Sequence, residues 1–315
     1  SLIRPVNLRG LPSDSTLVLL NGKRRHRASV IAFQGGGVND GAQGPDISVI
    51  PSVAIKQVEV LRDGAAAQYG SDAIAGVMNF VLKDDAEGGS ISVRQGEYFE
   101  GDGASTIVDA NIGLPLAESG FVNLSMQYKN ADATSRSVQR PDAAGLIAAG
   151  NTDVNDPAQI WGNPEIKDDL SLFANLGYDI DSTTKAYAFG NYSTREVTGG
   201  FYYRNPHNRG NVYSTDGGET LLVGAVNGDQ STCASVPIPK ITQTDGSVVD
   251  GNVLTSQPYL DMVADPNCFS MNMIDGYAGG YTPQFGGEIE DMSFVGGIKG
   301  EFGEWSYDAS ASFGN

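Results

Sequence analysis

The sequence predicts a β-rich membrane protein, an antiparallel transmembrane β-barrel that holds a small N-terminal α+β domain in its lumen. Three observations support this prediction. First, apolar residues alternate with polar or small ones in seven long segments after residue 87. Second, the links between those segments are either very short or very long. Third, the first 86 residues differ in composition and are rich in glycine-containing links. Such alternation is typical of a sheet that lies between lipid and an aqueous lumen.

The N-terminal region combines short β-rich runs with glycine-rich links. The runs cover residues 16–20, 47–50, 54–61 and 77–82, and residues 52–55 and 65–69 are predicted as short helical turns. Residues 1–86 are therefore predicted as one small mixed domain.

The seven alternating segments are predicted as strands of one sheet. They cover residues 89–98, 104–114, 120–130, 168–180, 184–196, 290–302 and 304–315. Residues 115–119, 181–183 and 303 form tight turns, whereas residues 131–167 and 197–289 form very long loops. Short periplasmic turns opposite long extracellular loops are typical of outer-membrane barrels. Aromatic residues near the strand ends fit interfacial girdles: Tyr128, Tyr178, Tyr187 and Trp305.

Two further arguments concern the membrane. No run reaches the ~18 apolar residues of a membrane helix, so strands would have to cross. Seven strands leave an open edge in lipid, and a barrel that encloses such a domain has about 22 strands. We therefore expect more strands after Asn315 and more of the small domain before Ser1. A soluble β-sandwich, whose strands alternate in the same way, is the alternative.

The composition excludes several classes of protein. With 38 acidic and 20 basic residues the formal charge is −18, which argues against nucleic acid as a partner. The basic run from Lys23 to Arg27 is interpreted as a solvated or ion-paired turn. The sequence has two histidines and shows no nucleophile, P-loop or zinc motif, and Asp168-Asp169 lacks EF-hand spacing. We expect no enzyme, no catalytic residue, no cofactor and no metal site.

Cys233 and Cys268 are the only cysteines, and both lie in the second long loop. A disulfide that closes this loop in an oxidising compartment is the favoured interpretation. A metal site is disfavoured because no CxxC spacing accompanies them. Two unpaired thiols remain an alternative, because sequence does not show pairing.

Three segments of the N-terminal region resemble, in order, the plug domain of TonB-dependent outer-membrane receptors. They are Leu8-Arg-Gly-Leu11 with the run from Thr16 to Lys23, the run from Ile50 to Arg62, and the run from Gly64 to Lys83. The order matters more than any single segment. The resemblance implies residues 1–86 as plug and residues 87–315 as the first barrel strands.

The resemblance also implies a function. Such a receptor binds a scarce solute, such as a siderophore, cobalamin or an oligosaccharide, and imports it across the Gram-negative outer membrane when TonB pulls on the plug. The TonB box would lie upstream of Ser1. Outer-membrane lipid and lipopolysaccharide would surround the barrel, and a surface lipoprotein is a further candidate partner. By motif position Arg9 and Arg62 match two arginines that lock the plug to the barrel. Local pairing with Glu59 or Asp63 is their alternative role.

Candidate solute contacts lie in loops. In the plug they are Phe33, Gln34, Asn39, Asp40 and Gln43, which lie in a glycine-rich loop. The alternative role of this loop is that of a spacer that fills the lumen. In the barrel loops they are Trp161, Tyr202, Tyr203, Arg204, His207, Tyr277 and Tyr281. Aromatic faces with cationic donors suit sugars, polyphenols or anionic chelates. The alternative is that these rings pack against one another within the loop.

Other functions fit the same pattern. A surface receptor could transduce a signal or hand its ligand to a partner, and a structural component of a larger assembly would lack the TonB box. A soluble acidic adhesin would remain in the aqueous fraction. The fold alone does not identify the solute.

Overall fold

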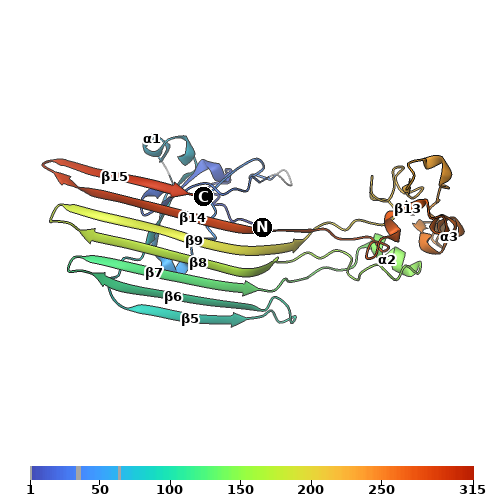
Figure 1. Cartoon of the computed structure of the whole chain (residues 1–315), viewed down its shortest axis with the longest axis horizontal. Coiled ribbons are helices and arrows are strands. Elements are labelled where there is room, and N and C mark those ends of the chain that lie inside the picture. The colour runs from blue at the N-terminus through green and yellow to red at the C-terminus, as the bar shows by residue number, and fades with distance from the viewer. Residues whose placement is uncertain (1, 33–36, 63–64) are drawn as a thin grey trace. The chain divides into compact units, whose positions relative to one another are not determined.

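The computed structural model of the chain describes residues 2–32, 37–62 and 65–315. It divides into two compact units (Figure 1). The first comprises Ser1–Ala133, Pro164–Thr198 and Gly286–Asn315, and the second comprises Thr134–Asn163 and Gly199–Phe285. Across the described part of the chain, no helix is long and apolar enough to span a membrane.

The N-terminal part of the first unit forms a four-stranded sheet in the order β2-β1-β4-β3. Its strands are β1 (Thr16–Leu20), β2 (Lys23–Arg24), β3 (Ile55–Leu61) and β4 (Gly76–Leu82). Strands β1 and β4 are parallel, and the other two pairs are antiparallel. The helical elements are η1 (Ser13–Ser15), η2 (Ser52–Ala54), α1 (Ala65–Tyr69) and η3 (Ser71–Ala73). Both predicted helical turns are therefore confirmed.

The predicted strand over residues 47–50 is wrong. Ser48 donates from its backbone nitrogen and its Oγ to Asp46 Oδ1, at 2.9 and 2.6 Å. This side-chain cap closes a turn, and such local bonds compete with strand pairing. The apolar residues of this segment suggest a strand. Val49 and Ile50 are apolar because they pack into the core.

Two glycines shape the four-stranded sheet. Asn21 and Gly22 both have positive φ (48° and 78°), as a two-residue hairpin turn between β1 and β2 requires. Gly76, at the start of β4, has φ 143°, and a Cβ there would lie 2.6 Å from the Leu61 carbonyl oxygen. A side chain at position 76 would therefore separate β4 from the end of β3.

The other strands of the first unit form a seven-stranded sheet in the order β15-β14-β9-β8-β7-β6-β5 (Figure 1). Every register that is defined in it is antiparallel. The strands are β5 (Gly89–Gly96), β6 (Ser105–Leu116), β7 (Gly120–Ala131), β8 (Glu165–Asp179), β9 (Thr184–Gly200), β14 (Gln284–Phe302) and β15 (Trp305–Gly314). All seven predicted strands are present, and β7, β8, β9 and β14 extend into the two predicted long loops.

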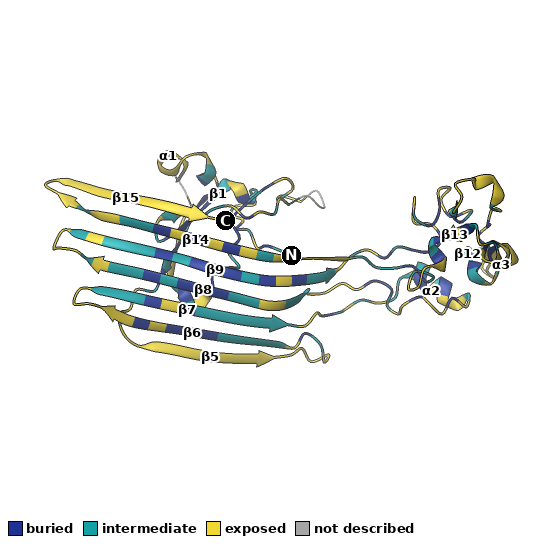
Figure 2. Cartoon of the chain, in the orientation of Figure 1, coloured by how far each residue is buried: buried dark blue, intermediate teal, exposed yellow. Residues whose placement is uncertain are grey.

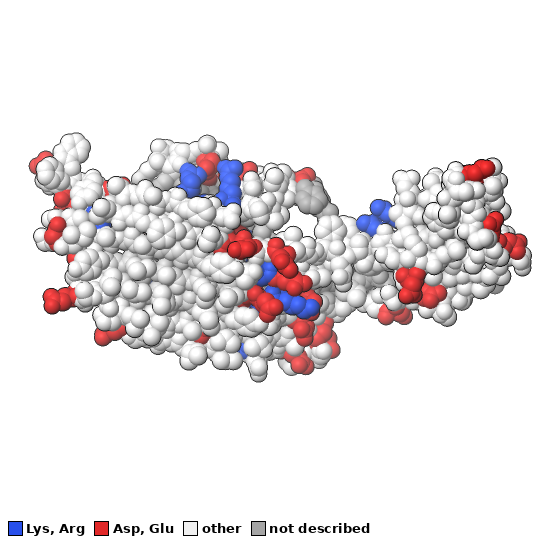
Figure 3. Space-filling model, in the orientation of Figure 1, with Lys and Arg blue, Asp and Glu red and all other residues white. Residues whose placement is uncertain are grey.

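The two faces of this sheet have opposite character. One face carries exposed apolar side chains, for example Ile91, Leu124 and Phe294, which are 78%, 40% and 56% exposed. The other face buries polar side chains: Asp109, Asn111, Asn123, Ser125, Ser171, Asn175, Asn191, Ser193, Asp291 and Ser293. In Figure 2, buried residues alternate with more exposed ones along the middle of β6, β8, β9 and β14, whereas β5 and β15 are exposed throughout. The sheet surface in Figure 3 is largely free of charged side chains except toward the strand ends.

This polarity is the reverse of a soluble sheet, which buries its apolar face. Among the described residues no second sheet covers the apolar face, so the β-sandwich alternative is wrong. An apolar outer face with a polar inner face is the pattern of a transmembrane barrel.

A hydrophobic core joins the two sheets of the first unit. Phe173, Phe189 and Val295 project from the polar face of the seven-stranded sheet. They pack with residues of the four-stranded sheet and its links: Val6, Val18, Leu20, Val49, Ile50, Ala54, Phe80 and Leu82. Burial of each such side chain contributes about 1.5–3 kcal/mol. The four-stranded sheet is therefore held against the inner, polar face.

The second unit contains elements that the sequence analysis treats as loop. They are α2 (Pro141–Ala148), β10 (Val223–Ala225), η4 (Gln230–Thr232), β11 (Lys240–Thr242), β12 (Val248–Asp250), η5 (Val253–Thr255), α3 (Gln257–Ala264), β13 (Cys268–Ser270) and η6 (Met271–Met273). Strands of three residues are too short to show a periodicity. Both α-helices have a proline in their first turn, a start signal that was not used.

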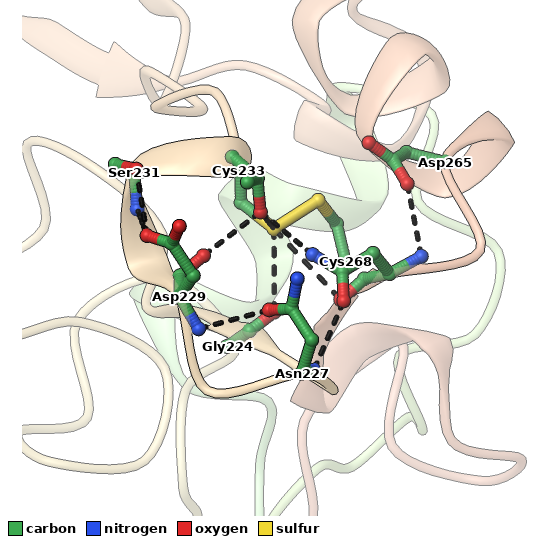
Figure 4. The surroundings of a disulfide bond; sticks show 9 residues. Gly224, Asn227, Asp229, Ser231, Cys233, Asp265 and Cys268 are labelled. Atoms are coloured by element: carbon green, nitrogen blue, oxygen red, sulfur yellow. Dashed lines mark hydrogen bonds between the residues drawn. A yellow bond between two sulfur atoms is a disulfide. The ribbon is translucent and has the colours of Figure 1, made fainter.

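A disulfide holds part of this unit. Cys233 and Cys268 are bonded, with their Cα atoms 5.6 Å apart (Figure 4). Cys268 lies on β13, which pairs with β10, and it packs in a core with Val236, Val253 and Met262. The bond therefore links a loop to a packed strand.

Candidate functional site

The first candidate site is a buried cluster where the segment after β2 meets β9 and β14. We call Arg25, His26, Asn191, Asp291 and Ser293 the Arg25 cluster. The Arg25 guanidinium pairs with Asp291, and its Nη1 donates to Asn191 Oδ1 at 2.7 Å and to Ser293 Oγ at 2.6 Å. His26 Nε2 lies 2.9 Å from Asp291 Oδ2. The planar fork of one arginine thus engages three side chains of the sheet.

A second cluster lies where the N-terminal segment meets β9. We call Leu2, Asp46, Ser48 and Arg195 the Asp46 cluster. Arg195 Nη2 donates to Asp46 Oδ2 and to the Leu2 carbonyl, each at 2.5 Å, and Nη1 donates to Ser48 Oγ. Asp46 Oδ1 accepts from the backbone nitrogens of Arg4 and Ser48, at 3.0 and 2.9 Å. Both carboxylate oxygens are therefore engaged.

Both ion pairs are almost fully buried. The side chains of Arg25 and Asp291 are 2% and 10% exposed, and those of Arg195 and Asp46 are 8% and 2% exposed. Removal of one partner from a buried pair costs about 3–5 kcal/mol, because the other charge remains uncompensated. Further polar side chains bind both guanidinium groups, although the buried Arg195 Nε has no hydrogen-bond partner among the described residues. The clusters therefore fix the position of the N-terminal part against the sheet.

The basic run from Lys23 to Arg27 is ion-paired, which was one of the two interpretations. Lys23 pairs with Asp308 on β15 at 2.9 Å, and Arg24 and Arg27 both pair with Asp72. Lys23 and Arg25 contact the seven-stranded sheet, while Arg24 projects toward η3 of its own domain. This alternation follows from the extended backbone of β2.

Arg9 and Arg62, the predicted locking pair, are exposed and close together. Arg9 Nη1 donates to the Arg62 carbonyl at 3.2 Å. Asp63, one suggested local partner, lies outside the described residues. A locking role for these two arginines remains a prediction, whereas Arg25 and Arg195 make buried contacts between the N-terminal part and the seven-stranded sheet.

The candidate residues of the glycine-rich N-terminal loop are only partly described. Phe33 and Gln34 lie outside the described residues. Asn39 exchanges two hydrogen bonds with Asn7, at 2.7 and 3.0 Å, and Gln43 donates to the Ala28 carbonyl at 2.7 Å. Asn39 thus ties the loop to the segment around Asn7, and Gln43 bridges the loop internally. Asp40 is exposed.

In the second unit, four rings form what we call the aromatic surface: Trp161, Phe201, Tyr202 and Phe285. Tyr202 makes edge contacts with Trp161 and Phe201, with ring centroids 5.0 and 4.9 Å apart. Phe201 also packs on Phe285 at 4.5 Å. Trp161, Tyr202 and Phe285 are each about half exposed. Three rings of this surface thus keep a face open to solvent.

The remaining aromatic and cationic candidates are less accessible. Arg204 lies over the Phe201 ring at 5.5 Å, and Tyr277 and Tyr281 contact each other at 4.9 Å. Tyr203 is buried, and its hydroxyl donates to the Gly279 carbonyl at 2.5 Å. His207 is fully buried, with Nδ1 3.1 Å from Asp250 Oδ2. Burial lowers the pKa of His207 and raises that of Tyr203. These two side chains stabilise the unit and do not face a solute.

The sequence analysis missed Asp46, Arg195 and Asp291. Their partners lie 149 and 266 residues away in sequence, so no local pattern indicates the pairs. One signal was present. Arg195 and Asp291 occupy inward positions in their alternating strands, where a charge requires a partner from the lumen.

The comparisons with known proteins agree with this geometry. Residues 3–77 match the model of the TonB-dependent Receptor Plug Domain, which covers β1, β2, β3 and the first two residues of β4. Residues 3–77 belong to the plug-domain family of TonB-dependent receptors. By this match, the four-stranded sheet is the plug. The seven-stranded sheet is a part of the barrel wall, and the barrel is not closed within these residues.

Curated relatives of the chain include a probable siderophore receptor and a vitamin B12 transporter. Over 157 residues the chain is 29% identical to a probable TonB-dependent siderophore receptor, PirA, of Acinetobacter baumannii, covering 49% of this chain and 20% of that protein. It is 30% identical over 204 residues to the vitamin B12 transporter BtuB of Photobacterium profundum, covering 56% and 31%.

A solved structure shares the fold. The ferric enterobactin receptor PfeA of Pseudomonas aeruginosa matches with a TM-score of 0.55 and 15% identity, covering 97% of this chain and 34% of that one. The chain therefore spans about a third or less of the length of each of these relatives. At this identity the likeness concerns the fold alone.

Proposed function

We propose that this chain is part of an outer-membrane import receptor of a Gram-negative bacterium. Residues 1–86 act as plug and residues 87–315 as the first strands of the barrel, without enzymatic activity. The observation that carries the proposal is the reversed polarity of the seven-stranded sheet together with the plug packed on its polar face. Lipid and lipopolysaccharide would cover the apolar face. A plug in the lumen would close the pore, so import would require the plug to move.

The buried clusters support gating rather than a permanent stopper. Two ion pairs and a small core hold the plug, so a moderate pulling force would be enough to separate it from the wall. TonB, through a segment upstream of this chain, would supply that force. A scarce small or oligomeric solute, such as a siderophore, cobalamin or an oligosaccharide, would be the cargo. A signalling, ligand-handing or structural role, with a surface lipoprotein as partner, is the alternative.

We further propose that the aromatic surface contributes to solute binding, with Asp40, Arg204, Tyr277 and Tyr281 as secondary candidates. Exposed rings with adjacent donors bind planar or sugar-like groups. Replacement of Trp161 and Tyr202 together by alanine should weaken binding. Phe269, which is 49% exposed in the same unit but outside the aromatic surface, gives a matched control variant, Phe269→Ala.

Uptake by intact cells tests the import function. Cells whose only receptor is this protein would be given labelled ferric enterobactin, cyanocobalamin and maltohexaose in parallel. We expect accumulation of one solute, and its loss when TonB is deleted. Surface binding without accumulation, unchanged by TonB deletion, would favour the signalling or structural alternative.

A further inference from the structure

A hollow lies in the apolar face of the seven-stranded sheet, on the side opposite the plug. Its volume is about 690 Å³, and residues of β6, β7, β8, β9, β14 and β15 line it. This volume is in the range of sites that hold small molecules. The side chains around it are all partly exposed and, apart from one tyrosine hydroxyl, apolar: Leu124, Leu172, Tyr192, Met292 and Phe294.

Small residues form the floor of this hollow. Ala174 on β8 pairs directly with Gly190 on β9. A Cβ at Gly190 would lie 2.4 Å from the Ser293 carbonyl oxygen, so the close approach of β9 and β14 requires glycine at this position. Leu172 and Tyr192 form the next outward pair of the same two strands. The floor therefore follows from how the strands pack.

The hollow lies toward the end of the apolar face from which the long loops leave. On β9, Glu196 follows Tyr192 at an outward position, next to the buried Arg195. On β14, Glu290 precedes Met292 at an outward position, next to the buried Asp291. Both glutamates are exposed, and neither forms a salt bridge with another described residue. In an outer-membrane barrel the long loops face the cell exterior, so these carboxylates stand at the outer boundary of the membrane.

The Tyr192 hydroxyl has no hydrogen-bond partner in the part of the chain that the structure describes. Tyr128, an outward tyrosine closer to the loops, instead donates to Asp168 Oδ1 at 2.8 Å. A hydroxyl without a partner in hydrocarbon costs free energy, so a lipid that offers an acceptor at this depth is favoured. The ester carbonyl of a phospholipid is such an acceptor, because it lies between the acyl chain and the head group.

We propose that the hollow binds one phospholipid with an ammonium head group, such as phosphatidylethanolamine. An acyl chain lies over Ala174 and Gly190, and an ester carbonyl accepts from the Tyr192 hydroxyl. The ammonium group lies beside Glu196 and Glu290. These carboxylates select the class of lipid, because they attract an ammonium group and repel the phosphates of lipopolysaccharide or of an anionic phospholipid. This inference rests on the outer-membrane location in the proposed function and adds a specific lipid to it.

Native mass spectrometry of the complete receptor, purified in detergent and freed of lipid, tests the site. Dioleoylphosphatidylethanolamine, dioleoylphosphatidylglycerol and lipid A are added in separate samples. We expect one bound phosphatidylethanolamine, held about tenfold more tightly than phosphatidylglycerol. Ala174→Phe covers the floor and should abolish this preference by lowering phosphatidylethanolamine binding. Ala309→Phe makes the same change on the same face of β15, outside the hollow, and should bind as the wild type does.

Two milder changes keep the test valid if Ala174→Phe does not fold, which heat-modifiable gel migration would show. Glu196→Gln with Glu290→Gln should bring phosphatidylethanolamine binding down to the level of phosphatidylglycerol. Glu304→Gln, an exposed glutamate at the short-turn end, is the control. Tyr192→Phe, which removes a single oxygen atom, should weaken phosphatidylethanolamine binding, whereas Tyr178→Phe should not.

Equal binding of the two phospholipids by the wild type, or equal phosphatidylethanolamine binding by the two alanine variants, would overturn the site. Preferential binding of lipid A would assign the hollow to lipopolysaccharide, and a receptor dimer that Ala174→Phe dissociates would assign it to a second copy. Either result contradicts the proposal. Since uptake is not measured, a receptor that binds phosphatidylethanolamine but accumulates no solute contradicts the import function alone. A receptor that stays in the aqueous fraction without detergent contradicts the membrane location, and the lipid site with it.

Discussion

Arg195 on β9 donates from Nη2 to Asp46 Oδ2 at 2.5 Å, and so joins the barrel wall to the turn that precedes η2 of the plug. The same guanidinium holds the Leu2 carbonyl at 2.5 Å. One side chain of the wall therefore holds both the segment around Leu2 and the turn before η2.

A double-mutant cycle measures this pair. Asp46→Leu or Arg195→Met alone should destabilise the plug by about 3–5 kcal/mol, because each leaves one buried charge unpaired. The double variant should recover the part of that loss that comes from the unpaired charge, but not the hydrogen bonds that Asp46 Oδ1 accepts from Arg4 and Ser48. Urea midpoints for protease cleavage of the plug give the values.

The exposed pair of Lys56 and Asp84, whose side chains are 51% and 44% exposed, is the matched control. Its removal should change stability by less than about 1 kcal/mol. Equal effects at the buried and the exposed pair would contradict the assignment of the Asp46 cluster as a plug anchor.

Arg25 should not tolerate lysine. Arg25→Lys keeps the charge but loses the fork that reaches Asn191, Asp291 and Ser293 together. Each lost charged hydrogen bond costs about 1.5–3 kcal/mol. We expect a looser plug and higher sensitivity of cells to vancomycin, which intact outer membranes exclude.

Arg24→Lys is the control for that variant. Arg24 is adjacent in sequence, but its pair with Asp72 is partly exposed and lies within the plug. Vancomycin sensitivity should stay at the wild-type level. If both variants behave alike, the Arg25 cluster does not hold the plug.

The sequence predicted the strands better than the contacts between them. Alternation in segments such as residues 120–130 reports which face is apolar, so the seven strands followed from pattern alone. The ion pairs could not be predicted from the pattern, because they depend on how two parts of the chain that are distant in sequence are placed in space. The helices of the second unit were missed for another reason: α2 and α3 have eight residues each, too few for a clear helical period. Burial of Tyr203 and His207 depends on that unrecognised core.

The disulfide should stabilise the second unit. Cys233 and Cys268 are 35 residues apart, and closing such a loop reduces the entropy of the unfolded chain by about 4 kcal/mol in the chain-entropy model. Cys233→Ala with Cys268→Ala should therefore raise protease cleavage within residues 199–285. Cleavage of the plug should not change. An unchanged digestion pattern would contradict a stabilising role.

His207 should make the second unit less stable in mild acid. Burial lowers the pKa of His207 below 6.5, Asp250 opposes that shift, and Lys240, which pairs with Asp250 at 2.8 Å, adds to it. The unfolded chain therefore binds a proton below pH 6.5 that the folded unit does not bind. Stability is complete above pH 6.5 and falls as the pH decreases, by up to about 1.4 kcal/mol for each pH unit, until the folded pKa is reached.

Protease cleavage within residues 199–285 from pH 7.5 down to pH 5 measures this dependence, since cleavage follows the population of the open form. His207→Gln removes the titrating group while keeping a donor for Asp250, so its cleavage should depend less on pH than that of the wild type. Asn208→Gln, an exposed neighbour, should retain the wild-type dependence. If His207→Gln retains it as well, another group accounts for the acid sensitivity and His207 is not held neutral by burial.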